Sequence, residues 1–479
     1  MKPLWKNAAF NIAYKFTGLL FPLIRSIYVS RILLTDGVGK IATGQNLVSY
    51  FVVFAALGIP SYGMREIAKA REDSNQRNRT FSELFTINAV STCFAIAGYL
   101  LLVFSVPDYR NELPLFLACG VQLLFNFISI DWLYEGEEEY IYIATRSIVI
   151  KLLATLALFL FVKTKEDYVV CALITSLGLG ANYLFNIFNA RKHVAFTFRG
   201  LRLKRHLPSL MVLLATYFFT TIYSKVDITM LGLMTTDSDV GLYSNANRLA
   251  DMLACTCSAV TGILLPRLSY YYENDRDQFL ALVATGTKVL AFLAIPLATG
   301  VFILAPQGVH LVFGPAFISS GSTLRIFAFL IPIRILGDLL CYQMALCTGN
   351  EKRRLPVYVA AVLVNIILNF LFIPRWRSDG AALASVLSSL VINVPLLLTM
   401  KRLVGFPIEW QAIGQALVSS AVMALSVLAV LYCVENYAAQ IVLSLVVGVS
   451  VYLVFNLKIG NEVARKMLHA GRRILAGRT

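Results

Sequence analysis

Apolar residues occur along the whole chain in long blocks, separated by short joints that contain charged residues, glycine or proline. A helix of about 20 apolar residues crosses the ~30 Å hydrocarbon core of a bilayer. A cleaved signal peptide would give a single block near the N-terminus. The pattern therefore predicts an all-α polytopic membrane protein. The expected spans, about fourteen, are residues 7–33, 39–60, 82–105, 113–134, 142–162, 168–189, 208–234, 240–265, 279–305, 318–347, 356–373, 380–400, 411–432 and 438–457.

Composition supports this assignment. Hydrophobic residues make up 58% of the 479 positions and charged residues 14%, against roughly 25% charged in soluble domains. The spans leave no stretch long enough for a soluble domain. The eight cysteines lie almost entirely in apolar blocks without metal-ligand spacing, and the four histidines are far apart. We therefore expect no metal, no cofactor and no enzymatic activity.

Lysine and arginine concentrate in alternate joints, such as residues 61–81 and 190–207, and in the C-terminal tail. Positive joints stay cytoplasmic, so we predict that both termini are cytoplasmic. Anchoring to anionic lipid explains most of the net charge of +15. Nucleic-acid binding would require a basic face with stacking aromatics on a soluble element, and the sequence predicts none.

An internal repeat is visible at an offset of 202 residues. Val38-Gly39 and Leu47 correspond to Val240-Gly241 and Leu249. Both segments follow an odd-numbered span, which indicates parallel repeats related by an axis normal to the membrane. We predict an N-terminal lobe over 1–206, a C-terminal lobe over 207–402, two accessory helices over 403–457 and a basic cytoplasmic tail over 458–479.

Two spans have a polar face. In the first, polar residues, glycine and proline recur at helical spacing, and the seventh repeats the pattern. Polar groups are costly in lipid, so these faces should point to the protein interior or to a wet cavity. Hydrogen bonding between helices is the alternative for the Thr and Ser positions. The residues are Asn11, Lys15, Gly18, Pro22 and Arg25 in the first span and Tyr217, Thr220, Thr221, Ser224 and Asp227 in the seventh.

Basic residues inside the spans are the main candidates for ligand binding, because a mid-bilayer Lys or Arg costs roughly 2.5 to 3.5 kcal/mol. Four lie eight or nine residues into a span, about 12 to 14 Å deep. Four lie nearer an end, where snorkelling to the headgroups is the alternative. Surplus cations suit an anionic ligand such as a pyrophosphate. The deep residues are Lys15, Lys151, Arg248 and Lys288, and the shallower ones are Arg25, Lys225, Arg325 and Arg334. We select Lys15, Lys151, Arg248, Lys288, Arg25 and Lys225 as substrate-binding candidates.

The carboxylates that we consider within the spans are Asp131, Asp227, Asp251 and Asp338. Arg334 and Asp338 are four residues apart and should neutralise each other. Asp227 occupies the repeat position equivalent to Arg25, so we hypothesise that these two form a gate. Asp131, Asp227 and Asp251 are the candidates for ion coupling.

Several stretches resemble a known family, the polysaccharide-specific branch of the multidrug, oligosaccharidyl-lipid and polysaccharide exporter superfamily, with its O-antigen type flippases. The resemblance extends over essentially the whole chain. It includes Asn7 through Arg31, Val38-Gly39, Tyr50-Phe51, Leu57-Gly58, Arg65-Glu66-Ile67-Ala68, Asp131-Trp132-Leu133-Tyr134 with Glu137 and Arg146, Gly349-Asn350-Glu351-Lys352, Asn365, Leu368-Asn369, Ile373-Pro374 and Gly380-Ala381-Ala382.

The resemblance implies a fourteen-helix transporter in which two six-helix lobes alternate around a central cationic cavity. It implies movement of an undecaprenyl-pyrophosphate-linked glycan repeat unit, for O-antigen, capsule or exopolysaccharide, from the cytoplasmic to the periplasmic leaflet of a bacterial inner membrane. Helices over 411–457 would border a groove for the lipid tail. The protein is expected to be a monomer. Its candidate partners are membrane lipid, a polysaccharide polymerase and the chain-length machinery.

Three alternatives are open. A cation-coupled exporter of small molecules shares the superfamily fold, but that task favours an acidic cavity. A membrane polysaccharide polymerase or glycosyltransferase needs a sizeable outer loop or a carboxylate-rich domain, and the predicted outer joints are short. A purely structural membrane protein would have little reason to retain buried cations.

Overall fold

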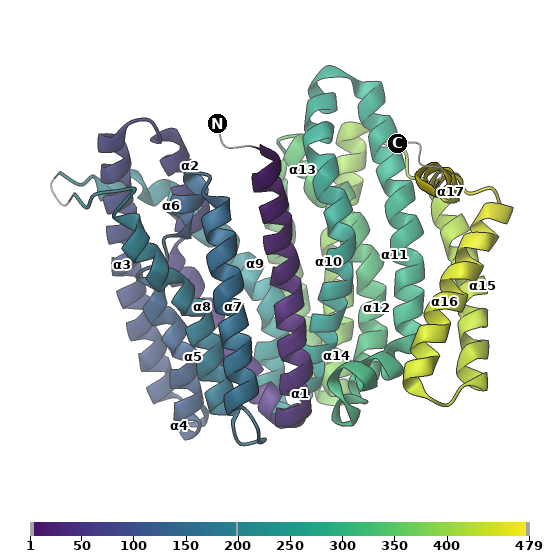
Figure 1. Cartoon of the computed structure of the whole chain (residues 1–479), viewed down its shortest axis with the longest axis horizontal. Helices are drawn as coiled ribbons and strands as arrows, with labels where there is room; N and C mark the ends of the chain where they lie inside the picture. The colour runs from purple at the N-terminus through teal and green to yellow at the C-terminus, as the bar shows by residue number, and fades with distance from the viewer. Residues whose placement is uncertain (1–3, 198–199, 476–479) are drawn as a thin grey trace. The chain divides into compact units, whose positions relative to one another are not determined.

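A computed structural model describes the backbone of residues 4–197 and 200–475, and the side chains of these ranges except at 4–17, 19, 20, 256–260, 263 and 470–475. The described part is helical, with short joints and no strands (Figure 1). Nine of its helical stretches have the length and apolar composition to cross a membrane. The chain divides into two compact units, residues 1–241 and 242–479. The predicted lobe boundaries at 206 and 402 were drawn from the sequence repeat, whereas the two units are defined by compactness. The lobe boundaries therefore stay predictions.

Two long helical stretches each contain two predicted spans. α1 (Leu4–Ala56) leaves helical geometry at Leu34, where φ is 57°. α14 (Arg354–Val404) does so at Arg377, where φ is 46°. A left-handed residue other than glycine costs roughly 1 to 2 kcal/mol, so a single residue marks each sharp bend. The predicted joints at 34–38 and 374–379 lie at these bends.

The first unit is a bundle of helices around the first part of the chain. α1 packs against α3, α5, α7, α8 and α9, and α2 packs against α6. The further elements are α2 (Ile59–Lys69), α3 (Ser74–Ser105), α4 (Pro107–Asn111), α5 (Leu113–Asn126), α6 (Asp131–Gly136), α7 (Tyr140–Phe161), α8 (Tyr168–Ala190), η1 (Leu203–Arg205), α9 (Leu207–Met234) and the beginning of α10 (Asp237–Asn274).

The second unit contains the rest of α10 and the C-terminal helices. α11 packs against α12, α15 and α16, and α15 and α16 form an antiparallel hairpin (Figure 1). Its elements are α11 (Arg276–Phe313), η2 (Pro315–Phe317), α12 (Ser320–Gly337), the π-helical η3 (Asp338–Gln343), α13 (Met344–Cys347), η4 (Glu351–Arg353), α14, α15 (Trp410–Cys433), α16 (Tyr437–Lys458) and α17 (Glu462–Leu475).

Two predicted spans are divided in the structure. The predicted span 113–134 breaks after Asn126, because the Asn126 side chain bonds to α3 and the backbone turns through 128–130 before α6 begins. The predicted span 318–347 changes to a π-helical turn at Asp338. Both breaks were missed because the mean hydropathy stays high across them. A few polar residues that bond inside the bundle change that mean very little.

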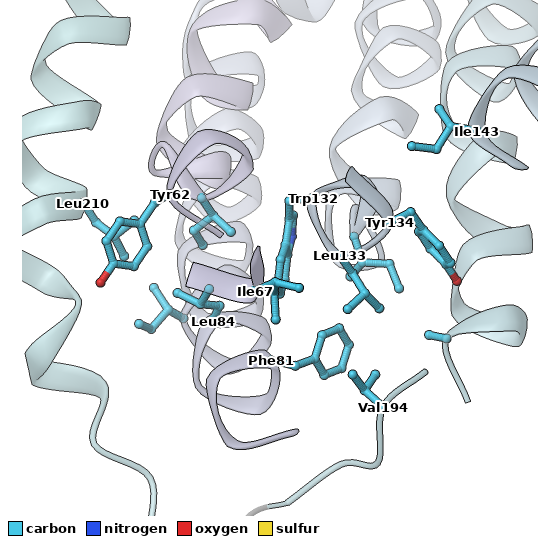
Figure 2. Packing of buried hydrophobic residues seen from close by; sticks show 14 residues of the cluster. Tyr62, Ile67, Phe81, Leu84, Trp132, Leu133, Tyr134, Ile143, Val194 and Leu210 are labelled. Atoms are coloured by element: carbon cyan, nitrogen blue, oxygen red, sulfur yellow. The ribbon is translucent and has the colours of Figure 1, made fainter. Parts of the chain in front are cut away.

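One end of the first unit has a dense apolar core (Figure 2). Trp132 of α6 packs against Phe81 of α3, with ring centroids 5.5 Å apart. A Cβ on Gly63 of α2 would lie 2.7 Å from the Trp132 ring, so only glycine allows α2 and α6 to approach this closely. Val194, from the segment after α8, closes the cluster. This core joins α2, α3 and α6 to the segment that leads into α9.

A buried carboxylate fixes the same segment. Glu83 of α3 is fully buried, and its Oε1 accepts a 2.6 Å hydrogen bond from the backbone N–H of Arg202. Its Oε2 lies 2.6 Å from Nη2 of Arg205 and 3.0 Å from Nε2 of His206. The hydroxyl of Tyr62 lies 2.9 Å from the other ring nitrogen of His206. Glu83 therefore holds the α8–α9 connection to α2 and α3.

We expect Glu83→Gln to lower the stability of the protein by about 2 kcal/mol, because the amide keeps the shape but removes a charge with several donors around it. Thermal unfolding of the purified protein in detergent measures this. Glu66→Gln is the matched control, since Glu66 forms an exposed pair with Lys69 at 2.8 Å and such pairs contribute little. Equal unfolding temperatures for the two variants would contradict the assignment of Glu83.

Candidate functional site

The predicted polar face of α1 lies against other helices of its own unit. A Cβ on Gly18 would lie 3.9 Å from Nζ of Lys151 of α7. One to two turns further along, Nη2 of Arg25 donates a 2.6 Å hydrogen bond to Oγ1 of Thr175 of α8. The hydroxyl of Tyr28 donates to the carbonyl of Val162 at 2.7 Å. At Gly18 and Arg25 the stripe thus faces neighbouring helices, as predicted, whereas Pro22 is exposed.

Arg25 has hydrogen-bonding capacity to spare. Its Nε–H is buried and has no partner among the described side chains, and no carboxylate pairs with it in that part of the chain. Since a guanidinium has five donors in a fixed fork, Arg25 can still bind phosphate or carboxylate oxygens. Lys151 is half-buried on the neighbouring helix. Gly18, beside which the Lys151 ammonium lies, and Arg25 are seven positions apart, which is about 10 Å along α1.

The other predicted cations differ in their surroundings. The side chain of Lys15 lies outside the described residues. Lys225 of α9 is half-buried and Arg248 of α10 is exposed, and both make interactions. Their predicted roles in substrate binding stay predictions.

Lys288 does not meet the expectation of an uncompensated cation at mid-depth. Its Nζ lies 3.0 Å from Glu462 of α17 and 3.8 Å from Glu409, which precedes α15. The reason is that α17 packs on α11 and brings Glu462 to Lys288. Binding of substrate by Lys288 remains only a prediction.

Two of the predicted carboxylates belong to ion pairs. Oδ1 of Asp131 accepts a 2.9 Å hydrogen bond from Nη2 of Arg146 and a second bond from Asn186. Asp251 pairs with Arg334, so the expected pair between Arg334 and Asp338 was wrong. Asp338 instead accepts hydrogen bonds from Thr261 and, at 3.3 Å, from Gln343. The π-helical turn that begins at Asp338 changes the direction of its side chain relative to an α-helix.

The hypothetical gate residues do not pair in this conformation. Asp227 of α9 is buried, at 4% exposure, and interacts with other groups. Arg25 donates to Thr175 instead. The gate therefore stays a prediction, as does ion coupling by Asp131, Asp227 or Asp251.

Two glycines of the sequence repeat meet in space. A Cβ on Gly39 would overlap the carbonyl of Asp237, and a Cβ on Gly241 would overlap the carbonyl of Thr35. At the repeat offset of 202, Thr35 corresponds to Asp237 and Gly39 to Gly241. The contact is reciprocal, which is the signature of a local two-fold relation. Repeat-equivalent turns therefore pack backbone to backbone.

An apolar groove lies on the second unit, along α11 and the α15–α16 hairpin. Its volume is about 470 Å³. Glycines at 300 and 308 leave its floor open, because a Cβ at either would meet nothing within 4 Å. The hydroxyl of Tyr452 donates to the carbonyl of Phe292 at 2.8 Å and fixes α16 against α11. The walls include Leu293, Pro296, Leu297, Met423, Val427 and Gly448.

Sequence reasoning missed two buried charged residues within the predicted spans. Glu83 is the second residue of the span 82–105, and Arg146 is the fifth residue of the span 142–162. Arg146 is 8% exposed, and its Nε and Nη1 have no partner among the described residues. A complete count of ionisable residues in the spans would have found both. Their partners lie too far away in the sequence to be identified from it.

Comparison with known proteins now adds the family. A family model described as "Polysaccharide biosynthesis protein" matches residues 4–271, more than half of the chain. The "Putative O-antigen transporter" of Escherichia coli (strain K12) is 20% identical over 402 residues, which are 83% of this chain and 97% of that protein. The "Probable flippase AglR" of Haloferax volcanii is 26% identical over 241 residues, which are 48% of this chain and 49% of that protein.

Solved structures show the same fold. "Lipid II flippase MurJ, inward closed conformation" matches with a TM-score of 0.77 at 17% identity, over 95% of this chain and 99% of that one. An inward-facing multidrug resistance MATE family transporter of the MOP superfamily matches with a TM-score of 0.58 at 14% identity, over 81% and 94%. The family resemblance and the all-α polytopic class expected from the sequence are confirmed. This multi-pass membrane protein belongs to the polysaccharide biosynthesis protein family and has the fold of MOP superfamily transporters.

Proposed function

We propose that the protein flips an undecaprenyl-pyrophosphate-linked oligosaccharide from the cytoplasmic to the periplasmic leaflet of a bacterial inner membrane. The carried glycan is a repeat unit of O-antigen, capsule or exopolysaccharide. The names of the relatives, a putative O-antigen transporter, a probable glycan biosynthesis flippase and a probable flippase, support this substrate class. Both termini are cytoplasmic, the protein acts as a monomer, and the polymerase and chain-length machinery receive the product.

The partly buried guanidinium of Arg25 carries the proposal. It has a hydroxyl partner and a free donor where a structural cation would have a carboxylate. Lys151 beside Gly18 adds a second positive charge along the same face. A diphosphate has several anionic oxygens and would satisfy both groups. Lys15, Lys225 and Arg248 are further ligands in the proposed cationic cavity, with Lys288 as a weaker candidate.

Transport proceeds by alternating access of two six-helix lobes, 1–206 and 207–402. The reciprocal contact of Gly39 and Gly241 supports this mechanism, because parallel repeats share such an axis. The backbone contact would serve as the pivot during rocking. Arg25 and Asp227 would close one side of the path, and any coupled ion would use Asp131, Asp227 or Asp251. Differential binding of substrate in the two states must provide the driving force.

The apolar groove supports a separate place for the polyprenyl chain. It is open along α11 and is bordered by α15 and α16, the helices expected to hold a lipid tail. The diphosphate and glycan would cross between the lobes while the chain stays in this groove and in the surrounding lipid. Such a division avoids the cost of burying a sugar in hydrocarbon.

Arg25→Ala should reduce translocation of a polyprenyl-diphosphate-linked glycan at least tenfold in liposomes that contain the purified protein. A hydrogen bond from a charged group is worth about 1.5 to 3 kcal/mol, which corresponds to about tenfold or more. Lys163→Ala is the control, because Lys163 is an exposed basic residue in the joint after α7. A normal rate for Arg25→Ala, with unchanged protein content of the liposomes, would reject the assignment of the cationic face.

Gly39→Ala and Gly241→Ala should have similar and large effects, because each methyl group would overlap a backbone carbonyl that cannot rotate away. We expect a loss of about 2 kcal/mol or more in stability, together with loss of translocation. Thermal unfolding in detergent is the measurement. Gly414→Ala is the control, since nothing lies within 4 Å of its Cβ position. If Gly39→Ala unfolds at the same temperature as Gly414→Ala, the close contact is not essential.

Gly300→Leu should fill the groove without disturbing the fold, because the space beside Gly300 is open. We expect several-fold slower translocation of a long-chain substrate and an unchanged unfolding temperature. Gly414→Leu, outside the groove, should leave both quantities unchanged. Unchanged translocation by Gly300→Leu would show that the groove does not hold the substrate chain.

A further inference from the structure

A second hollow adjoins the apolar groove of the second unit. It has a volume of about 390 Å³ and lies between α11 and α17. Phe292, Leu293 and Met467 line both hollows, so the two are adjacent. In contrast to the groove, this cleft contains charged side chains, which are Lys288 of α11 and Glu462 and Lys466 of α17. The combined space thus has a charged end and a long apolar end, as a lipid does.

A carboxylate lies between the two ammonium groups of the cleft. Oε1 of Glu462 accepts a 2.6 Å hydrogen bond from Nζ of Lys466, and its Oε2 accepts a 3.0 Å bond from Nζ of Lys288. Glu409 is a more distant second partner of Lys288, at 3.8 Å. The two lysines therefore already hold one anionic group, in a position where a phosphate could accept the same hydrogen bonds.

Glu462 is held in a way that a competing anion can overcome. Its side chain is 53% exposed and that of Lys466 is 67% exposed, and exposed ion pairs contribute little. Hydrogen bonds from Lys466 and Lys288 lower the pKa of Glu462 to about 2. The carboxylate therefore stays ionised throughout the neutral range, and protonation does not release it. Replacement by another anion is the remaining route.

The charge of the cleft selects the kind of anion. With Glu462 turned into water, Lys288, Lys466 and Glu409, the second partner of Lys288, together carry one net positive charge. A phosphodiester has one negative charge and balances it, whereas a lipid diphosphate has more. The basic amphipathic helix α17 would lie at the level of the headgroups, where anionic phospholipids are abundant.

We propose that the cleft between α11 and α17 binds the phosphodiester of an anionic bilayer phospholipid, which replaces the Glu462 carboxylate on Lys288 and Lys466 while its acyl chain lies in the apolar groove. The site shares Lys288, the weaker substrate candidate, and uses none of the other proposed substrate cations. It goes beyond the proposed function, because a resident phospholipid would occupy the groove before any other lipid chain enters.

Native mass spectrometry of the full-length protein with defined lipids tests this site without any transport step. The probes are phosphatidylglycerol and phosphatidylcholine. Wild-type protein should retain phosphatidylglycerol in preference to phosphatidylcholine. Glu462→Gln should raise the affinity for phosphatidylglycerol about two- to tenfold, because it removes the competing charge from two exposed ion pairs. The affinity for phosphatidylcholine should rise less.

The combined substitution Lys288→Gln and Lys466→Gln should abolish the preference for phosphatidylglycerol. Glu66→Gln is the matched control, since it removes a partly exposed carboxylate that pairs with the exposed Lys69 in the other unit. Its lipid binding should equal that of the wild type. A gain of affinity in Glu462→Gln cannot result from misfolding, so that variant remains informative even if the double variant is unstable.

Unchanged or weaker binding of phosphatidylglycerol by Glu462→Gln would overturn the proposal and would mean that Glu462 only fastens α17. A polyprenyl diphosphate serves as a third probe. If it binds more tightly than phosphatidylglycerol and responds to the same substitutions, the assignment to a bilayer phospholipid is wrong. Lipid retention is measured without translocation. Either result is therefore independent of the proposed transport function, which the translocation assays test separately.

Discussion

The structure depends on one constraint, the absence of water from the bilayer core. A polar group at that depth must find its partners within the protein, since each unsatisfied group costs several kcal/mol. Asn88, Thr92 and Asn126 meet this requirement by bonding to one another between α3 and α5, at 2.6 to 3.1 Å. The same requirement explains the ion pair of Arg146 with Asp131 inside the first unit. Polar contacts of this kind determine which helices are neighbours.

Against this background Arg25 differs from three other cations within the spans. Arg334, Arg146 and Lys288 each have a carboxylate partner, which is how a structural cation is normally accommodated. Arg25 has a threonine hydroxyl and a donor left over. The presence or absence of a carboxylate partner is therefore the ground on which we propose Arg25, rather than Arg146 or Arg334, as a binding residue.

The fold could be predicted well from the sequence, because bilayer thickness sets the length of every span and apolar blocks therefore reveal helices. The interruptions at 127–130 and at Asp338 were not predicted, because side-chain hydrogen bonds rather than hydropathy accompany them. Ion-pair partners were also missed, because they lie far apart in the sequence. Arg334 was assigned to Asp338, four residues away, but pairs with Asp251, 83 residues away. Likewise Lys288 is matched by Glu462 through the folding of α17 onto α11, which no local pattern indicates. The repeat, by contrast, was visible in a few residues because glycine alone fits the contact.

The most direct test of the central claim compares two substrates in liposomes that contain the purified wild-type protein. One is a polyprenyl-diphosphate-linked glycan, and the other is the same glycan joined to the same polyprenyl chain through an uncharged link. If sheltered cations exist to hold the anionic group, only the diphosphate form should be translocated at a rate above that of protein-free liposomes. Equal translocation of the uncharged form would contradict this account.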